Sequence, residues 1–255
     1  MGHQPFRLSI WAMMLFSVTA YGFFFLLPIY LQQVHGYTTF QSGLILLPGA
    51  LFAGVATLLS GILSDRINPK KVAAMCLLGA AVASWRFHSD MDTPRELLYL
   101  DYICWGFFIG GAFAPITLLA LGTLEERDVA NGSTLVNVSR LVAGSIGTSY
   151  ATSLLSIKKD SFYEALSANL TWGNPALDEL LSRFSIYAGN TTVAFDPDTW
   201  HRLLFQAKQI LLVRAASYAF EATYEYLALF PLAALVCVVL VKGNSNHRGI
   251  KPPLH

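Results

Sequence analysis

Two long stretches near the start of this sequence, residues 8–31 and 42–63, contain no charged side chain. Each is long enough to cross a bilayer as a helix, which takes roughly 20 apolar residues. Only 13% of all residues are charged and 54% are hydrophobic, whereas a typical soluble domain carries about 25% charged residues. The sequence therefore predicts an integral membrane protein. The net charge of +1 gives no basic excess of the kind that binds nucleic acid.

Four further apolar segments extend the pattern, so that the fold class is predicted as all-α with six transmembrane helices. The predicted spans are residues 8–31, 42–63, 72–87, 97–121, 133–157 and 223–241. The first span follows Arg7 and could be interpreted as a secretory signal peptide. Its apolar stretch exceeds the roughly 7–15 residues of a signal core, so we interpret it as a true span.

Lysine and arginine in the short loops predict the orientation, because these residues accumulate on the cytoplasmic side. Only Arg95, with Arg86 at the membrane edge, lies in a short outer loop if the N-terminus is cytoplasmic. The other basic residues outside the spans and the long outer segment are then inside: Arg7, Arg66, Lys70, Lys71, Arg127, Lys242, Arg248 and Lys251. We therefore expect a multi-pass protein of the plasma or inner membrane with both termini in the cytoplasm.

The predicted organisation has five spans over residues 1–157, an outer segment over 158–222, a last span over 223–241 and a cytoplasmic tail over 242–255. Apolar residues within 200–211 recur at helical spacing, which predicts an amphipathic helix before the last span. This helix either follows the membrane surface or packs on the outer ends of the spans. No internal repeat is evident along the chain.

The motifs of soluble enzymes are missing from the sequence. It has no His/Cys cluster at metal-binding spacing, no Gly-x-Ser-x-Gly elbow and no phosphate-binding glycine loop. We therefore predict no enzymatic activity, no cofactor and no metal site. Movement of a solute across the membrane and a structural role remain.

The loop after the second span carries a first specific motif. Residues 61–71 read Gly-Ile-Leu-Ser-Asp-Arg-Ile-Asn-Pro-Lys-Lys and resemble the short loop of the major facilitator superfamily. Asn68 and Pro69 replace the glycine and the first basic residue of that pattern. Asn68 is expected to tolerate the left-handed backbone that a glycine would supply. The alternative interpretation is a charged loop that only fixes the topology.

Two further regions make the resemblance more specific. Residues 27–37 (Leu-Pro-Ile-Tyr-Leu-Gln-Gln-Val-His-Gly-Tyr) and 41–50 (Gln-Ser-Gly-Leu-Ile-Leu-Leu-Pro-Gly-Ala) resemble the start of the C-terminal half of fourteen-span drug:proton antiporters. Residues 130–148, with Ala-Asn-Gly-Ser, Asn-Val-Ser-Arg and Ala-Gly-Ser-Ile-Gly-Thr in order, resemble the penultimate span of these proteins. The similarity is to the EmrB/QacA type of exporter and covers about residues 10–157.

The resemblance implies one bundle of a transporter in which two bundles rock around a central site and exchange lipophilic small molecules for protons. The implied partners are membrane lipid, an N-terminal half of six to eight spans or a second copy and, in a double-membraned bacterium, a periplasmic adaptor. Two alternatives stay open. One is a non-transporting subunit or truncated product that associates with a full-length transporter. The other is an exporter of a lipid, a siderophore or a metabolite.

Arg140 is the first candidate functional residue. A charge at the centre of a span costs about 2.5–3.5 kcal/mol or more unless it is paired or wetted, and Arg140 matches the arginine in the family sequence Asn-x-x-Arg. We predict a gating ion pair between Arg140 and Asp65, which is followed by Arg66. A static pair or a snorkelling arginine is the alternative interpretation.

Two carboxylates are candidates for proton coupling. Asp101 lies near the outer end of the fourth span and Glu225 near the outer end of the last. Burial would raise the pKa of such a carboxylate. The alternatives are interfacial pairing of Asp101 with Arg95 or Arg86, and interface anchoring by Glu225.

Small residues and prolines within the spans predict close helix contacts and kinks. The candidates are Gly61, Gly106, Gly110, Pro115, Gly144 and Gly147. Aromatic side chains crowd two spans, at Tyr21, Phe23, Phe24, Phe25 and Tyr30 and at Trp105, Phe107, Phe108 and Phe113. They would line a pocket for lipophilic cations or, alternatively, face lipid.

Overall fold

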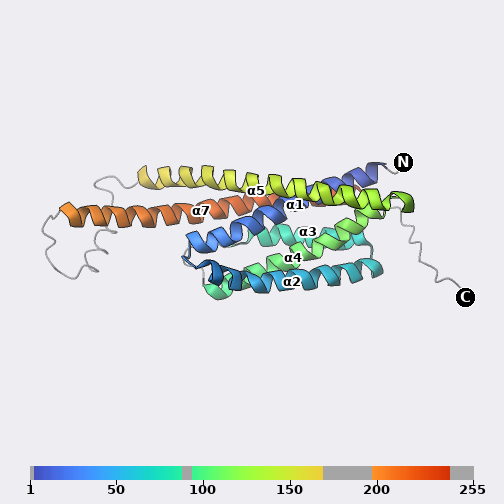
Figure 1. The fold of residues 1–255 in the computed structure, drawn as a ribbon, viewed down its shortest axis with the longest axis horizontal. Helices are drawn as coiled ribbons and strands as arrows, with labels where there is room; N and C mark the ends of the chain where they lie inside the picture. The colour runs from blue at the N-terminus through green and yellow to red at the C-terminus, as the bar shows by residue number, and fades with distance from the viewer. Residues whose placement is uncertain (1–2, 88–93, 169–196, 242–255) are drawn as a thin grey trace, which may run out of the picture.

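The computed structural model describes residues 3–87, 94–168 and 197–241. Within these ranges the chain forms helices and no strand: α1 (His3–Gln33), α2 (Thr39–Arg66), α3 (Pro69–Trp85), α4 (Arg95–Leu121), the short 3-10 helix η1 (Glu126–Asp128), α5 (Val129–Ala168) and α7 (Pro197–Leu240). The six α-helices run back and forth along one bundle (Figure 1). Each predicted span coincides with one of them, so the all-α, six-helix prediction is confirmed.

Four of the described helices, α1, α2, α4 and α7, are long and apolar enough to cross a membrane. Helix α3 has 17 residues and is therefore about 25 Å long, short of a hydrocarbon core of about 30 Å. Helix α5 is longer, but it is rich in serine and threonine and contains Arg140. Both pack against the apolar helices and complete the bundle.

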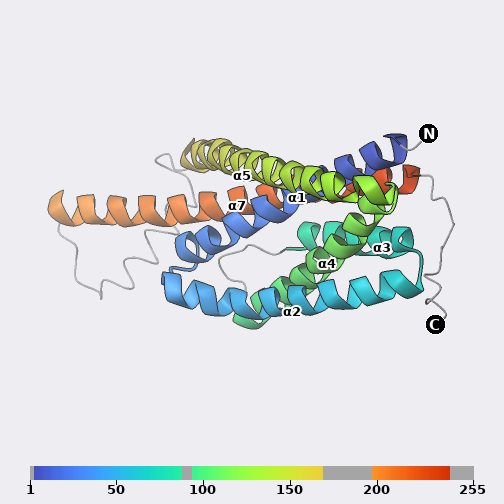
Figure 2. The same cartoon turned by 45° about the vertical axis from the view of Figure 1, so that its right-hand side comes forward.

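The packing repeats between the first three helices and the last three. Helix α1 packs on α5 as α4 packs on α2, and α1 contacts α7 as α4 contacts α3. Figure 2 shows α1, α5 and α7 on one side of the bundle and α2, α3 and α4 on the other. Helices α1 and α4 run in opposite directions (Figure 1). The bundle therefore consists of two repeats of inverted topology, one formed by α1, α2 and α3 and the other by α4, α5 and α7. No repeat is evident in the sequence.

Glycines bring the two closest helix pairs into backbone contact. A Cβ at Gly110 would overlap the carbonyl oxygen of Ala53, and one at Gly106 would overlap the carbonyl oxygen of Gly49. These contacts join α4 to α2. On the other side of the bundle, a Cβ at Gly147 of α5 would overlap the backbone of α1. Close approach at small residues is a common mode of helix association in membranes.

An aromatic cluster holds together the half of the bundle that contains the C-terminal part of α1. The Phe23 ring of α1 is stacked between Trp105 of α4 at 4.4 Å and Tyr224 of α7 at 4.2 Å between ring centroids. The Trp105 Nε1–H donates a hydrogen bond of 3.1 Å to the hydroxyl of Ser84 on α3. The three rings are fully buried, so this cluster links four helices through packing.

The outer segment differs from its prediction. Helix α5 continues past residue 157 to Ala168, and α7 runs unbroken from Pro197 to Leu240. Both predicted boundaries, after 157 and after 222, therefore fall inside helices, because no glycine or proline interrupts the chain there. The helix predicted over 200–211 is the first part of the helix that contains the last span. Both helices extend beyond the rest of the bundle at one end (Figure 1). Residues 169–196 and the tail 242–255 lie outside the described residues.

The short connection between α2 and α3 corrects one expectation. Asn68 has φ −58° and ψ 120°, so the expectation of a left-handed backbone there is wrong. Its side-chain oxygen instead accepts a hydrogen bond of 3.0 Å from the backbone N–H of Lys70, and Pro69 opens the helix. Asparagine is a favoured N-cap, and proline suits the first helical position, where no N–H is needed. The two departures from the family pattern thus start α3 directly.

Lys70 joins the start of α3 to the end of α7. Its Nζ donates hydrogen bonds to the carbonyl oxygens of Val239 at 2.7 Å and Val241 at 2.8 Å, which a helix end leaves without partners. We expect Lys70→Met to remove about 1 kcal/mol and to lower the melting temperature in detergent by roughly 2–4 °C. Lys71→Met is the control, because Lys71 is exposed. An equal decrease in both variants would argue against the cap.

The turn between α1 and α2 packs an imidazole between two phenol rings. His35 Nε2 lies 3.0 Å from the Tyr30 hydroxyl in a hydrogen bond, and its ring stacks on Tyr37 at 5.6 Å between centroids. Gly36 has φ 68°, a left-handed conformation that favours glycine. Burial lowers the pKa of His35 below its ordinary value.

This lowered pKa predicts a loss of stability in mild acid. The unfolded chain binds a proton on His35 near its ordinary pKa of about 6.5, while the folded protein binds it only at lower pH. The contribution of His35 to the free energy of unfolding is therefore full above about pH 6.5. It falls as the pH drops from there to the pKa in the folded protein, by at most about 1.4 kcal/mol per pH unit. Melting curves between about pH 7.5 and about pH 5 should show this slope, and His35→Gln should reduce it. An unchanged slope in the variant would assign the acid sensitivity to other groups.

Candidate functional site

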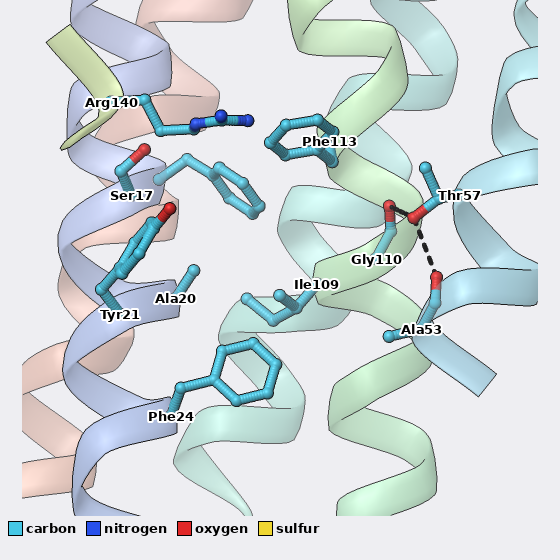
Figure 3. A pocket seen from close by; sticks show the side chains of 11 residues that line it. Ser17, Ala20, Tyr21, Phe24, Ala53, Thr57, Ile109, Gly110, Phe113 and Arg140 are labelled. Atoms are coloured by element: carbon cyan, nitrogen blue, oxygen red, sulfur yellow. Dashed lines mark hydrogen bonds between the residues drawn. The ribbon is translucent and has the colours of Figure 1, made fainter. Parts of the chain in front are cut away.

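A cavity of about 330 Å³ opens between α1, α2, α4 and α5. It is lined by Phe16, Ser17, Ala20, Tyr21 and Phe24 of α1, Ala53 and Thr57 of α2, Ile109, Gly110 and Phe113 of α4, and Arg140 of α5. Figure 3 shows these side chains around a common space. No described residue of α3 or α7 is among them. The volume and the mainly apolar, aromatic lining are typical of small-molecule pockets, which measure about 300–1,000 Å³.

Helices α2 and α4 are joined at the cavity wall by a threonine hydroxyl that contacts backbone carbonyl oxygens of both helices. Thr57 Oγ1 lies 2.8 Å from the carbonyl oxygen of Ala53 on its own helix and 2.8 Å from that of Gly110 on α4. The two carbonyl oxygens share the single proton of this hydroxyl, and both contacts are drawn in Figure 3. The hydroxyl can approach the second oxygen because Gly110 has no side chain. Thr57 therefore sets the register of the two helices at the depth of the cavity.

Arg140 supplies the formal charge of the cavity. Its guanidinium carbon lies 4.8 Å from the centroid of the Phe113 ring, within cation–π distance. Its Nε is buried and has no hydrogen-bond partner among the described residues. Leaving a buried donor unpaired costs about 1–3 kcal/mol, and more for a charged group. The cavity therefore has a cationic side chain in its lining.

The predicted inner lock is not formed in this conformation. Asp65 and Arg66 are both exposed at the end of α2. Arg140 lies about 16 Å along α5 from its start at Val129. Over the described ranges, no ion pair joins Asp65 to Arg140.

The two predicted proton-coupling carboxylates lie apart from the cavity. Asp101 is half-buried on α4 and Glu225 is exposed on α7, and neither is among the residues that line the cavity. Arg86, one of the two cations considered for Asp101, is exposed just beyond α3. The structure therefore does not bring the carboxylates and Arg140 together.

The remaining packing candidates differ in how tightly they are placed. A Cβ at Gly144 would come within 2.9 Å of the Tyr21 ring, so this glycine makes room for a residue of the cavity wall. A Cβ at Gly61 would find its nearest atom, Ala114 Cβ, at 3.9 Å, an ordinary contact. Pro115 lies buried inside α4. Gly61 is thus not required for a close helix contact in this conformation.

The aromatic residues singled out from the sequence are divided between several surroundings. Tyr21, Phe24 and Phe113 line the cavity, whereas the others are buried in the core, partly buried or exposed. Phe16 and Ser17 line it as well and were not predicted. Ser17 lies one turn before Tyr21, and Phe16 lies one turn before Ala20, another residue of the lining. Helical spacing from Tyr21 and Phe24 was therefore the signal that could have found them.

Comparison with known proteins gives consistent similarities. A family model described as Major Facilitator Superfamily matches residues 1–148. The uncharacterized MFS-type transporter YhcA of Bacillus subtilis is 29% identical over 234 residues, which cover 91% of this chain and 40% of that protein. The multidrug resistance protein B homolog of Mycobacterium tuberculosis is 34% identical over 150 residues (56% and 27%). The multidrug export protein EmrB of Escherichia coli is 28% identical over 167 residues (64% and 32%). The chain thus spans less than half the length of these curated relatives.

A solved structure shares the fold. It is the crystal structure of a bacterial homolog of the human lysosomal transporter Spinster, in an inward-facing and occupied conformation. The TM-score is 0.65 at 16% identity, and the match covers 94% of this chain and 49% of the other. At this identity the likeness concerns the arrangement of helices alone.

Proposed function

The chain belongs to the major facilitator superfamily, and we propose that it forms the C-terminal bundle of a proton-coupled exporter of lipophilic small molecules. The observation that carries the proposal is the cavity between α1, α2, α4 and α5, with aromatic walls and one cationic side chain. Curated relatives named for multidrug resistance and export support the choice of cargo. A second bundle would complete the site.

The exposed face of α5 supports a facing partner. Ser145, Ser149, Thr152, Ser153 and Ser156 are all exposed, and a lipid tail offers none of these hydroxyls a hydrogen bond. The hydroxyls of Ser145 and Thr152 bond to carbonyl oxygens of their own helix instead, a common arrangement for such residues in membrane helices. An N-terminal half of six to eight spans, or a second copy of this chain, would cover the face.

We further propose that the protein lies in the cell membrane and that both termini of the six-helix bundle lie in the cytoplasm. The basic residues Arg7, Arg66, Lys70, Lys71 and Arg127 lie near those helix ends that share one side of the bundle with the N-terminus, as the positive-inside rule requires of cytoplasmic loops. The extensions of α5 and α7 then project outward. In a double-membraned bacterium they would meet a periplasmic adaptor.

A dye-efflux assay tests the proposed function. Cells that lack their own exporters and express the complete native polypeptide should accumulate less of a lipophilic dye than cells with an empty vector, and an uncoupler should remove the difference. The dye is either the cation ethidium or the anion 1-anilinonaphthalene-8-sulfonate. Cells that express only residues 1–255 show whether this bundle transports alone. Equal accumulation of both dyes in all cells, with the protein detected in the membrane, would favour a non-transporting subunit.

A further inference from the structure

We propose that the cavity binds amphiphilic anions, molecules that carry one acidic group on an apolar body. The inference deepens the proposed function and rests on it for the direction of transport. Binding itself can be measured without any transport.

The charge of the lining favours an anion. Among the 11 residues that line the cavity, Arg140 is charged, and no aspartate or glutamate is present in the set. The predicted carboxylates, Asp65, Asp101 and Glu225, all lie outside it. An entering cation would meet a charge of its own sign among mainly apolar side chains. An entering anion would meet its counter-ion.

The geometry of Arg140 points the same way. Its guanidinium reaches from α5 to the ring of Phe113 (Figure 3) and lies 4.8 Å from the ring centroid. A guanidinium offers its donors in the plane of a rigid fork, which suits a carboxylate. The Nε donor of this fork is buried and without a partner among the described residues. An acidic group bound at the guanidinium would offer this side chain the acceptors that the described residues do not provide for Nε.

The aromatic rings then serve the apolar body of the ligand. Phe16, Tyr21, Phe24 and Ile109 line the cavity together with Phe113. The sequence alone suggested that such rings would receive lipophilic cations. In the structure, however, the Phe113 ring already carries the cation of Arg140. The other rings give apolar contact to the body of the ligand. That ligand is either an aromatic, drug-like acid or a single-chain lipid acid.

Binding of matched probes tests the inference. The complete native polypeptide is purified in a neutral detergent and titrated at about pH 7.5 with tritiated naphthalene-2-carboxylate, its neutral carboxamide and the (2-naphthylmethyl)trimethylammonium cation. These probes share one ring system and differ in charge. We expect the carboxylate to bind at least about tenfold more tightly than the cation, and Arg140→Gln to remove about tenfold or more of its affinity while the affinity for the carboxamide stays unchanged. Arg127→Gln, the same substitution at an exposed arginine, should leave all three affinities unchanged.

Two additions keep the test decisive. Phe113→Leu removes the ring beneath the guanidinium and should weaken the carboxylate by about two- to fivefold, which provides a second variant if Arg140→Gln does not fold. Oleate titrated in the same way separates the sources of the ligand, because tighter binding of oleate indicates a lipid acid and tighter binding of naphthalene-2-carboxylate a drug-like acid. Tighter binding of the cation, or carboxylate affinity that does not depend on Arg140, would overturn the inference. Failed efflux with Arg140-dependent anion binding would overturn only the proposed function.

Discussion

Replacing Gly110 with alanine should destabilise the bundle although it adds a single methyl group. That methyl would overlap the carbonyl oxygen of Ala53 and lie 2.6 Å from its Cα. Both partners are backbone, so no side chain can rotate away, and α2 and α4 must move apart. The movement also stretches the hydrogen bond of 2.8 Å between Thr57 and the Gly110 carbonyl oxygen. Overpacking of this kind costs about 1–3 kcal/mol or more.

Gly61→Ala is the matched control for this prediction. At Gly61 the new methyl would find its nearest atom at 3.9 Å, and alanine is favoured over glycine inside a helix by about 0.5–1 kcal/mol. The two variants should therefore change the melting temperature in opposite directions, with a decrease of roughly 5–10 °C for Gly110→Ala. Size-exclusion chromatography after heating in detergent measures both. A similar increase in both variants would show that α2 and α4 are not packed as described.

Much of the fold could be predicted because a bilayer leaves few alternatives to apolar helices. The uncharged runs at 8–31 and 42–63 mark α1 and α2 directly. The partners of each helix could not be predicted, because helices that are apolar all round carry no stripe to show which face packs. Gly106, Gly110 and Gly147 indicated that close contacts exist, but not that they join α4 to α2 and α5 to α1. The continuity of α7 could not be predicted, because the limits of an apolar span do not show where its helix begins.

The candidate site was predictable where a residue is costly in its surroundings. Arg140 stands out as a charge within an apolar span, and the structure places it in the cavity. Phe16 and Ser17 carry no such signal, since the same side chains occur in cores and against lipid. The sequence predicts a pair of Asp65 and Arg140 because both residues are expected toward the cytoplasmic side of the membrane. Position along the membrane normal does not give the distance between two helices, and the two side chains are not paired in this conformation.

Replacing Arg140 with alanine should abolish export while the protein stays folded in the membrane. The substitution removes the charge of the cavity together with a buried Nε that has no partner among the described residues, so the melting temperature should stay the same or rise. Transport should fall by at least about tenfold, because the substrate loses its counter-ion or the transport cycle loses its gate. Opposite effects on stability and transport distinguish this outcome from simple unfolding. Export that is retained at normal expression of the variant would rule out both roles of Arg140.

Asp65→Asn then separates the two roles of Arg140. A lock that closes the inner side must bring Asp65 to Arg140 in another conformation of the transport cycle, because no ion pair joins these two described residues here. If this lock drives export, the Asp65→Asn protein should lose export as fully as the Arg140→Ala protein, whereas Arg140-dependent binding of naphthalene-2-carboxylate should persist. If export in the Asp65→Asn protein is unchanged, the lock is excluded and Arg140 acts within the cavity. Asp65 is exposed, so its replacement should not disturb folding, and a difference in export would report on the ion pair itself.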